Sequence, residues 1–219
     1  MTFNAIAAAK RVHPYGCILG VCFLVLSPLF CFEYATDTYT IELVGLEAFS
    51  LSMFANGRLI TGAAMRLFAM ANWSVKAFYA VSFLLALICS SVAVYRMQRI
   101  LQAYIQRGSS LFFSFLTVFN PCAVEYFLFI EKGFFMLAVC ASVCAAEQFQ
   151  RFLNGKRSRL VLSLLFLTVA AFTYQVLPGA FVPIAALLIV LNAVNIKQFV
   201  LHNCAAILVY GGASLLNYL

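Results

Sequence analysis

Charged side chains are scarce in this chain of 219 residues, because Asp, Glu, Lys and Arg together make up only 10% of the sequence. Hydrophobic residues make up 65%, and the mean hydropathy is +1.00. A chain with so few polar side chains cannot cover the surface of a water-soluble globule. The composition therefore excludes a soluble domain and indicates an integral membrane protein.

The apolar runs also lack the alternation of apolar and polar positions that is typical of transmembrane β-strands. At about 1.5 Å per residue, runs of roughly 16 to 22 residues come close to crossing about 30 Å of hydrocarbon as helices. We therefore predict an all-α, polytopic membrane helix bundle that forms a single transmembrane domain over residues 1–219. The seven spanning helices that we expect cover residues 16–32, 75–95, 109–128, 133–149, 160–176, 179–194 and 199–217.

The first span and the division between the fifth and sixth spans each have an alternative interpretation. The first run could be a signal peptide, but it ends in bulky side chains from Pro28 to Phe32, where a cleavage site needs small ones, so we expect a retained helix. The fifth and sixth spans are divided only by a turn predicted at Pro178-Gly179. If that turn forms, the two helices make a tight hairpin.

The basic residues predict the orientation of the bundle. Positive charge near helix ends stays on the cytoplasmic side, so the N-terminus is expected there. Anionic lipid headgroups then balance the charge, and the basic composition requires no nucleic-acid partner. Ten of the fourteen basic residues fall in connections on the side of the N-terminus: Lys10, Arg11, Arg96, Arg99, Arg107, Arg151, Lys156, Arg157, Arg159 and Lys197.

Acidic residues show the opposite distribution, which predicts that any chemistry takes place on the outer side. The outer connections hold six of the seven acids: Glu33, Asp37, Glu42, Glu47, Glu125 and Glu131. The eight cysteines are scattered through apolar runs without the paired spacing of a metal site, so we predict no metal ligands among them. No pairing of a nucleophile with either histidine can be proposed.

Glu33 and Asp37 open the longest polar interruption, the outer connection over residues 33–74. Their spacing brings both carboxylates to one face if the first helix continues beyond the bilayer. Carboxylates beside aromatic rings such as Tyr34 and Tyr39 are suited to holding a sugar, or to accepting a proton from its hydroxyl group. The alternative is that the two carboxylates only mark the solvated end of the helix.

The second part of this connection, residues 41–71, is too apolar for a solvated loop and too interrupted for a span. We predict a helix on the outer surface, then a short helix that dips back, with Asn56-Gly57 as the turn between them. Arg58 and Arg66 would face the headgroup region, where a guanidinium can bind a phosphate with two parallel hydrogen bonds. The alternative is that both arginines extend to lipid headgroups without specificity.

Further polar residues gather at the outer ends of later spans. Asn120-Pro121 is followed by Glu125, whose ionisable group inside an apolar stretch suggests function, and Tyr174-Gln175 brings a phenol and an amide to the end of the fifth span. The alternative for Tyr174 and Gln175 is hydrogen bonding between neighbouring helices. We expect Glu131 and Lys132 to neutralise each other.

Taken together, these motifs resemble the N-terminal half of the type II O-antigen glucosyltransferases of serotype conversion, which belong to the GT-C class. The resemblance rests on Asn56-Gly57-Arg58-Leu59 followed by Met65-Arg66-Leu67-Phe68, on Asn120-Pro121 with Glu125, and on Tyr174-Gln175. It implies transfer of a sugar, typically glucose, from a polyprenyl-phosphate donor to a lipid-linked glycan at the periplasmic face of the bacterial inner membrane.

In that class an acidic residue of the first outer loop is essential, a role that the resemblance assigns to Glu33 or Asp37 as general base. Arg58 would offset the charge on the leaving phosphate, and Asn56, Asn120, Glu125, Tyr174 and Gln175 would line the substrate site. No cofactor is implied, although the acidic loop could hold a divalent cation.

Members of that family are usually longer, and this sequence stops at Tyr218-Leu219, before the later helices and the large outer segment. We therefore expect a truncated part of an enzyme, or a short form that works with a further membrane subunit. The competing class is a non-enzymatic membrane protein such as a lipid-linked sugar flippase or an assembly subunit. A flippase needs polar groups through the depth of the bilayer, whereas the polar residues here gather at the outer ends.

Overall fold

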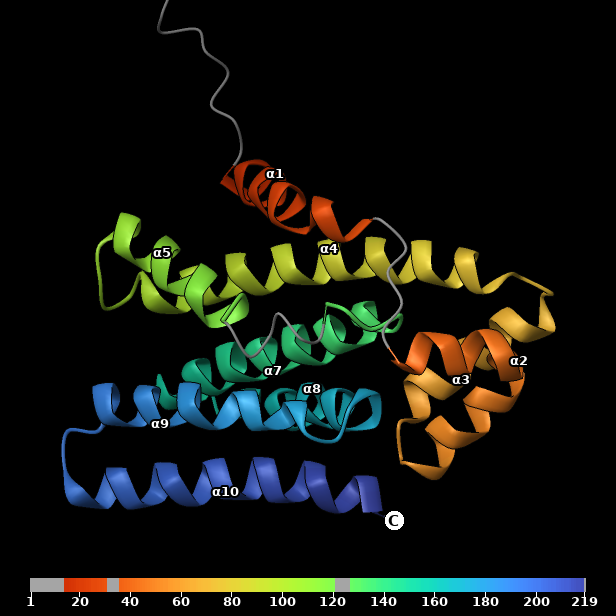
Figure 1. The fold of residues 1–219 in the computed structure, drawn as a ribbon. Coiled ribbons are helices and arrows are strands. Elements are labelled where there is room, and N and C mark those ends of the chain that lie inside the picture. The colour runs from red at the N-terminus through yellow and green to blue at the C-terminus, as the bar shows by residue number, and fades with distance from the viewer. Residues whose placement is uncertain (1–13, 31–35, 121–126, 219) are drawn as a thin grey trace, which may run out of the picture.

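The computed structural model of the protein describes residues 14–30, 36–120 and 127–218. The described residues form helices and no strand, which confirms the predicted all-α fold (Figure 1). In chain order the elements are α1 (Pro14–Leu26), η2 (Ser27–Phe30), α2 (Thr36–Ala55), α3 (Leu59–Met70), α4 (Val75–Leu101), α5 (Arg107–Val118), α7 (Lys132–Leu153), α8 (Arg159–Thr173), η3 (Leu177–Ala180), α9 (Phe181–Asn192) and α10 (Ile196–Tyr218).

Three helices in the described part, α4, α7 and α10, are long and apolar enough to cross a membrane. This is fewer than the seven that the sequence predicts, because the other apolar helices are shorter than a full span. In two of these shorter helices a proline lies in a 3₁₀ turn at one end. Pro28 lies in η2 after α1, and Pro178 lies in η3 before α9. The predicted break at Pro178-Gly179 is confirmed.

The long helices run side by side, with α4 against α7, α8 and α9 against α7, and α10 against α8 and α9 (Figure 1). Helices α4, α7 and α9 run in one direction, and α1, α8 and α10 run in the other (Figure 1). The start of α4 and the end of α10 therefore lie at the same end of the bundle. Following the predicted orientation, we call this the outer end and the opposite one the inner end.

Small residues allow α4 and α7 to approach closely. The backbone N–H of Gly133 donates to Ser82 Oγ at 2.9 Å, and a Cβ at Gly133 would lie 2.3 Å from the Ser82 carbonyl oxygen. On the opposite side of the bundle α10 exposes large apolar side chains, among them Ile207 and Leu208, each 69% exposed. Such a face is costly in water and suits contact with lipid.

Helices α2 and α3 form a pair at the outer end (Figure 1). The backbone of Gly45, at φ 81° and ψ 162°, is not helical and divides α2 into two parts. A turn at Asn56-Gly57 separates the end of α2 from the start of α3. The predicted pair of helices and the turn between them are confirmed.

Candidate functional site

The turn between α2 and α3 ends in a Schellman motif that sets the position of Arg58. The N–H of Arg58 donates to the carbonyl oxygen of Met53 and that of Gly57 to Phe54, both at 2.9 Å. Gly57 has a φ of +69°, and a Cβ there would lie 2.3 Å from Gln175 Nε2. The backbone conformation therefore favours a glycine, and a Cβ would also force the end of the Gln175 side chain, just beyond the end of α8, to move.

The guanidinium of Arg58 lies on the ring of Tyr174. Its Cζ atom is 3.9 Å from the ring centroid, within the range of a cation–π interaction, and Nη1 is 3.6 Å from Met53 Sδ. Tyr174 has left the helical conformation, at φ −157° and ψ 113°, and its ring packs against Phe135 at 4.2 Å between centroids. The side chain of Arg58 remains 24% exposed, so the guanidinium is oriented without being enclosed.

A buried carboxylate lies on another side of the same guanidinium. Glu131, which directly precedes α7, has a side chain only 1% exposed, and its Oε1 atom is 4.0 Å from Arg58 Nη1. The neighbouring Lys132 donates to the Tyr79 hydroxyl at 2.9 Å and to the Leu29 carbonyl at 3.5 Å. Sequence reasoning gave Glu131 little weight because it expected neutralisation by Lys132. The signal that could have identified Glu131 is its place between two aromatic, apolar stretches.

A hydrogen bond between residues that are far apart in the sequence joins α3 to the end of α8. The hydroxyl of Thr61, one turn into α3, donates to the carbonyl oxygen of Thr173 at 3.0 Å, and both residues are buried. The last carbonyl groups of a helix lack hydrogen-bond donors within the helix, and the Thr61 hydroxyl is the donor for one of them. The hydrogen bond from Thr61 to Thr173 thus helps to hold the segments that carry Arg58 and Tyr174 together.

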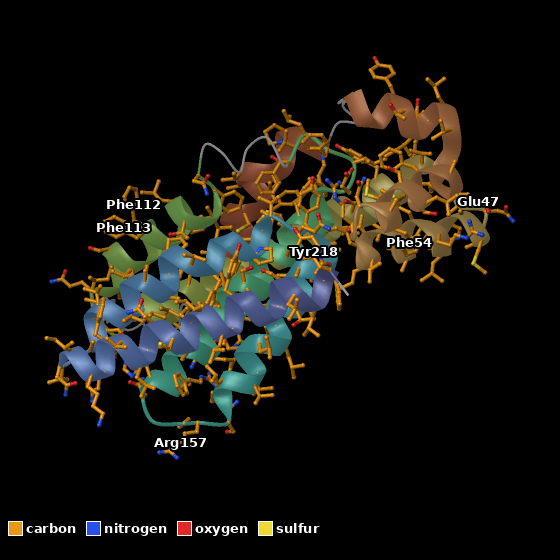
Figure 2. The ribbon with its side chains drawn as sticks, turned by 90° about the horizontal axis from the view of Figure 1, so that it is seen from below. Glu47, Phe54, Phe112, Phe113, Arg157 and Tyr218 are labelled. Atoms are coloured by element: carbon orange, nitrogen blue, oxygen red, sulfur yellow. The ribbon has the colours of Figure 1, made fainter. Side chains whose placement is uncertain are left out.

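Next to this cluster lies a hollow of about 490 Å³ with mixed polar and aromatic walls. Figure 2 labels two of its lining residues, Phe54 and Tyr218, at the outer end of the molecule. Asn217 Oδ1 is buried there without a hydrogen-bond partner among the described residues. The other lining residues are Ala55, Gly57, Leu59, Phe172, Gln175 and Leu216.

The structure brings together three of the predicted substrate-binding residues: Arg58 and Tyr174 in the cluster, and Gln175 in the wall of the hollow. Asn56 belongs to the same turn, but it is exposed and its Nδ2 atom is 3.5 Å from Ser52 Oγ, one turn earlier in α2. Asn120 follows α5, which lies along the half of α4 away from α2 and α3 (Figure 1). The site therefore does not include Asn120, because the packing of α5 on α4 keeps it apart.

The side chains of the predicted general bases, and that of Glu125 from the predicted substrate site, are not among those that the structure describes. Glu33 and Glu125 lie outside the described ranges, and Asp37 lies in the first turn of α2, where only the backbone is described. Only the second part of α2, after Gly45, leads into the turn that carries Arg58. Within the described ranges no three His, Cys, Asp or Glu residues gather as metal ligands, and the divalent cation stays a prediction.

At the inner end, Glu147 forms a second ionic cluster. Its Oε2 atom accepts a hydrogen bond from Arg96 and its Oε1 atom one from Arg151, both at 2.7 Å. The Glu147 side chain is 5% exposed. Arg96 comes from α4, whereas Glu147 and Arg151 both belong to α7, so this cluster joins the two central helices.

No protein-family model, curated protein or solved structure matches this chain. The resemblance to the glucosyltransferases therefore rests on the short motifs alone.

Proposed function

We propose that the chain is a membrane glycosyltransferase, or part of one, that moves a sugar, with glucose as the first candidate, from a polyprenyl-phosphate donor to a lipid-linked O-antigen glycan. The observation that carries this proposal is the guanidinium of Arg58, oriented by Tyr174 and Glu131 beside a hollow of about 490 Å³ at the outer end. The combination fits a ligand with a phosphate at one end and a polar ring at the other.

Arg58 is the group that would bind the donor phosphate. A guanidinium has five N–H donors, so it can face the Glu131 carboxylate and still bind a phosphate with two hydrogen bonds. Because Tyr174 and the backbone of the turn already orient it, little conformational entropy is lost when the phosphate binds. In the transition state the guanidinium stabilises the negative charge that builds up on the leaving phosphate.

The hollow would take the sugar. Its volume lies within the roughly 300 to 1,000 Å³ typical of small-molecule sites, which combine apolar walls with a few polar groups. The amides of Gln175 and Asn217 can donate to and accept from sugar hydroxyls, and the buried Asn217 Oδ1 has an unused acceptor. Phe54, Phe172 and Tyr218 supply apolar surface for the ring.

In the reaction, the acceptor hydroxyl oxygen attacks the anomeric carbon while the bond from that carbon to the phosphate oxygen breaks, and the phosphate leaves with the electron pair. The hydroxyl proton passes to a carboxylate, for which we retain Asp37 or Glu33. Glu131 is assigned a positioning role, because its carboxylate is almost fully buried beside Arg58. No step requires a cofactor.

For the membrane arrangement we propose seven crossing segments in the bacterial inner membrane, with the N-terminus in the cytoplasm. Besides α4, α7 and α10, these are α1 with η2, the predicted span over residues 109–128 to which most of α5 belongs, α8, and η3 with α9. Segments somewhat shorter than the hydrocarbon can cross where the bilayer thins locally. Their alternating directions in the bundle support this threading (Figure 1).

Three buried serines favour chemistry at the surface over transport. The hydroxyls of Ser90, Ser142 and Ser163 donate to the backbone carbonyls of Ala86, Leu177 and Ala145 at 2.7 to 3.1 Å. The bonds of Ser142 and Ser163 join neighbouring elements and that of Ser90 stays within α4, so all three hydroxyl groups are bonded to the backbone and offer no path for a sugar. A flippase would need such groups to be open to a passage.

The test uses cells that carry the full gene and an assay for glucosylated O-antigen, with protein level measured in parallel. Arg58→Ala should reduce modification at least tenfold at unchanged protein level, and Arg58→Lys should recover only part of it. Arg66→Ala is the matched control, because its guanidinium pairs with the exposed Glu47 at 2.8 Å, and it should leave modification unchanged. Equal loss of modification and protein in Arg58→Ala would assign Arg58 to folding.

The general base is tested separately with Asp37→Asn and Glu33→Gln. One of the two should abolish modification while the protein level stays constant. Full modification in both variants would remove these residues from the mechanism.

A further inference from the structure

Two hollows at the inner end share a wall and differ in character. The first, of about 440 Å³, has a mixed wall with two guanidinium groups and two amides: it is lined by Arg99, Arg107, Gln98, Gln102, Tyr95, Ile105 and Pro14. The second, of about 430 Å³, shares Pro14, Gln98 and Arg107 with the first. The two hollows therefore adjoin each other between α1, α4 and α5.

The second hollow is largely apolar and extends from the inner end toward the middle of the bundle. From α1 it is lined by Cys17, Ile18 and Val21, and from α5 by Gly108, Leu111 and Phe115. Val21 lies seven residues beyond Pro14 in α1, which is about 10 Å along a helix axis. The second hollow thus begins near the guanidinium groups and extends about 10 Å along α1, which is long enough for the part of an acyl chain nearest the headgroup.

The arginines of the first hollow carry uncompensated charge. Neither Arg99 nor Arg107 forms an ion pair within the described residues, and both are exposed. The one acidic side chain at the inner end of the described bundle, Glu147, is engaged at both oxygens by Arg96 and Arg151. Arg107 is also the first residue of α5, a helix of 12 residues whose N-cap Gln106 makes no side-chain hydrogen bond. Its first N–H groups add positive potential to the same place.

We infer that these adjoining hollows together bind one anionic phospholipid of the cytoplasmic leaflet. The phosphodiester lies between Arg99 and Arg107, the amides of Gln98 and Gln102 face the glycerol and headgroup oxygens, and one acyl chain lies between α1 and α5. The polar and apolar parts of the two hollows match the polar and apolar parts of one lipid. Binding of this lipid is independent of the proposed glycosyl transfer, because it uses no residue of the outer site.

The inference is tested with the purified full chain in detergent, by native mass spectrometry with added phosphatidylglycerol or phosphatidylcholine of the same chain length. We expect retention of one phosphatidylglycerol and not of phosphatidylcholine. Arg99→Ala with Arg107→Ala should weaken retention about 25-fold, since each arginine near an anionic headgroup contributes about fivefold. The control pair, Lys156→Ala with Arg157→Ala, removes two exposed cations outside both hollows and should change nothing.

A second variant separates a built site from general attraction of charge. Leu111→Trp fills the apolar hollow and leaves every charge in place, so it should lower retention of phosphatidylglycerol at least fivefold without lowering the thermal stability of the lipid-free protein. Unchanged retention in this variant, or an equal loss in the control pair, would overturn the inference in favour of nonspecific attraction. Displacement of the lipid by millimolar inorganic phosphate would also overturn it, because the site would then recognise phosphate without the chain.

Discussion

The two ends of the bundle each hold a buried glutamate beside arginine, and they use it differently. At the inner end both oxygens of Glu147 are hydrogen-bonded at 2.7 Å, by Arg96 and Arg151. At the outer end Arg58 approaches Glu131 only to 4.0 Å and rests on the face of Tyr174 instead. The inner carboxylate is thus saturated by its partners, whereas the outer guanidinium keeps donors that can bind a ligand.

This difference shows that the presence of an ion pair does not by itself mark a site. The inner cluster joins α4 to α7, and both oxygens of its carboxylate already accept hydrogen bonds from arginine. A guanidinium that is oriented by a ring and a turn, and whose chain neighbours Gly57 and Leu59 line a hollow, is arranged for binding at some cost in stability. The comparison predicts that changes at the inner end act on folding and changes at the outer end act on function.

Breaking the inner cluster should have the largest effect on stability. Glu147→Gln removes the charge that two arginines share and should lower the free energy of unfolding by about 2 kcal/mol, a value below that for fully buried pairs because both arginines are about one third exposed. Titration with SDS in mixed micelles measures this change in the free energy of unfolding. Any remaining glycosyl transfer should track the amount of folded protein; a variant of full stability and low activity would place Glu147 in function.

Gly57 and Gly155 compare the two ends at positions of similar backbone conformation. Both have positive φ, +69° and +88°, but a Cβ at Gly57 would meet Gln175 Nε2 at 2.3 Å, whereas a Cβ at Gly155 would meet nothing within 4 Å. Gly155→Ala should therefore cost about 1 kcal/mol from backbone strain alone. Gly57→Ala should cost slightly more, about 1.5 kcal/mol, because the end of the Gln175 side chain must move, and it should also lower activity by displacing that amide. Equal values in the same titration would mean that Gln175 moves away freely.

The ring of Tyr174 can be tested apart from its hydroxyl group. Tyr174→Phe keeps the aromatic face under Arg58 and should leave the binding of donor close to normal. Tyr174→Leu removes that face and should cost about 1 kcal/mol of stability, together with a several-fold loss of activity. A loss in Tyr174→Phe as large as in Tyr174→Leu would show that the hydroxyl group, and not the cation–π contact, is what matters.

The smallest effect is expected at the exposed pair of the outer helices. Arg66 and Glu47 lie 2.8 Å apart, nearly the same distance as Arg151 and Glu147, but Glu47 is 67% exposed and Glu147 only 5%. Arg66→Ala should change stability by less than about 0.5 kcal/mol, whereas Arg151→Ala should cost about 1 kcal/mol. Equal losses of stability in the two variants would contradict the expectation that the more buried ion pair contributes more.

Much of the helical framework follows from the sequence because hydrophobic length and turn residues are local properties. Asn56-Gly57 and Pro178-Gly179 mark their turns correctly, since glycine and proline act through their own backbone. Of the seven predicted spans, three correspond to helices in the described part that are long enough to cross a membrane. The sequence does not show that α5, α8 and α9 have only 12, 15 and 12 residues, because hydropathy marks an apolar segment without marking where its helix begins and ends.

The candidate site was predicted in part. The sequence placed Arg58, Tyr174 and Gln175 on one side of the membrane, and the structure brings them together. It could not show that Glu131 approaches Arg58, because that contact joins the start of α7 to the α2–α3 turn, more than seventy residues earlier. It also could not exclude Asn120, whose position depends on how α5 packs against α4.

The break at Gly45 has a mechanical consequence for the outer helices. A continuous helix resists bending through its ladder of backbone hydrogen bonds, and a residue with non-helical φ and ψ interrupts that ladder. Nothing lies within 4 Å of where a Cβ of Gly45 would be, so the surroundings do not brace the joint. Bending of α2 is therefore easiest at Gly45, and a rotation there changes the distance between the segment with Asp37 and the guanidinium of Arg58. The buried side chain of Ile41, in one apolar cluster with Met65 and Phe78, limits how far that segment can turn.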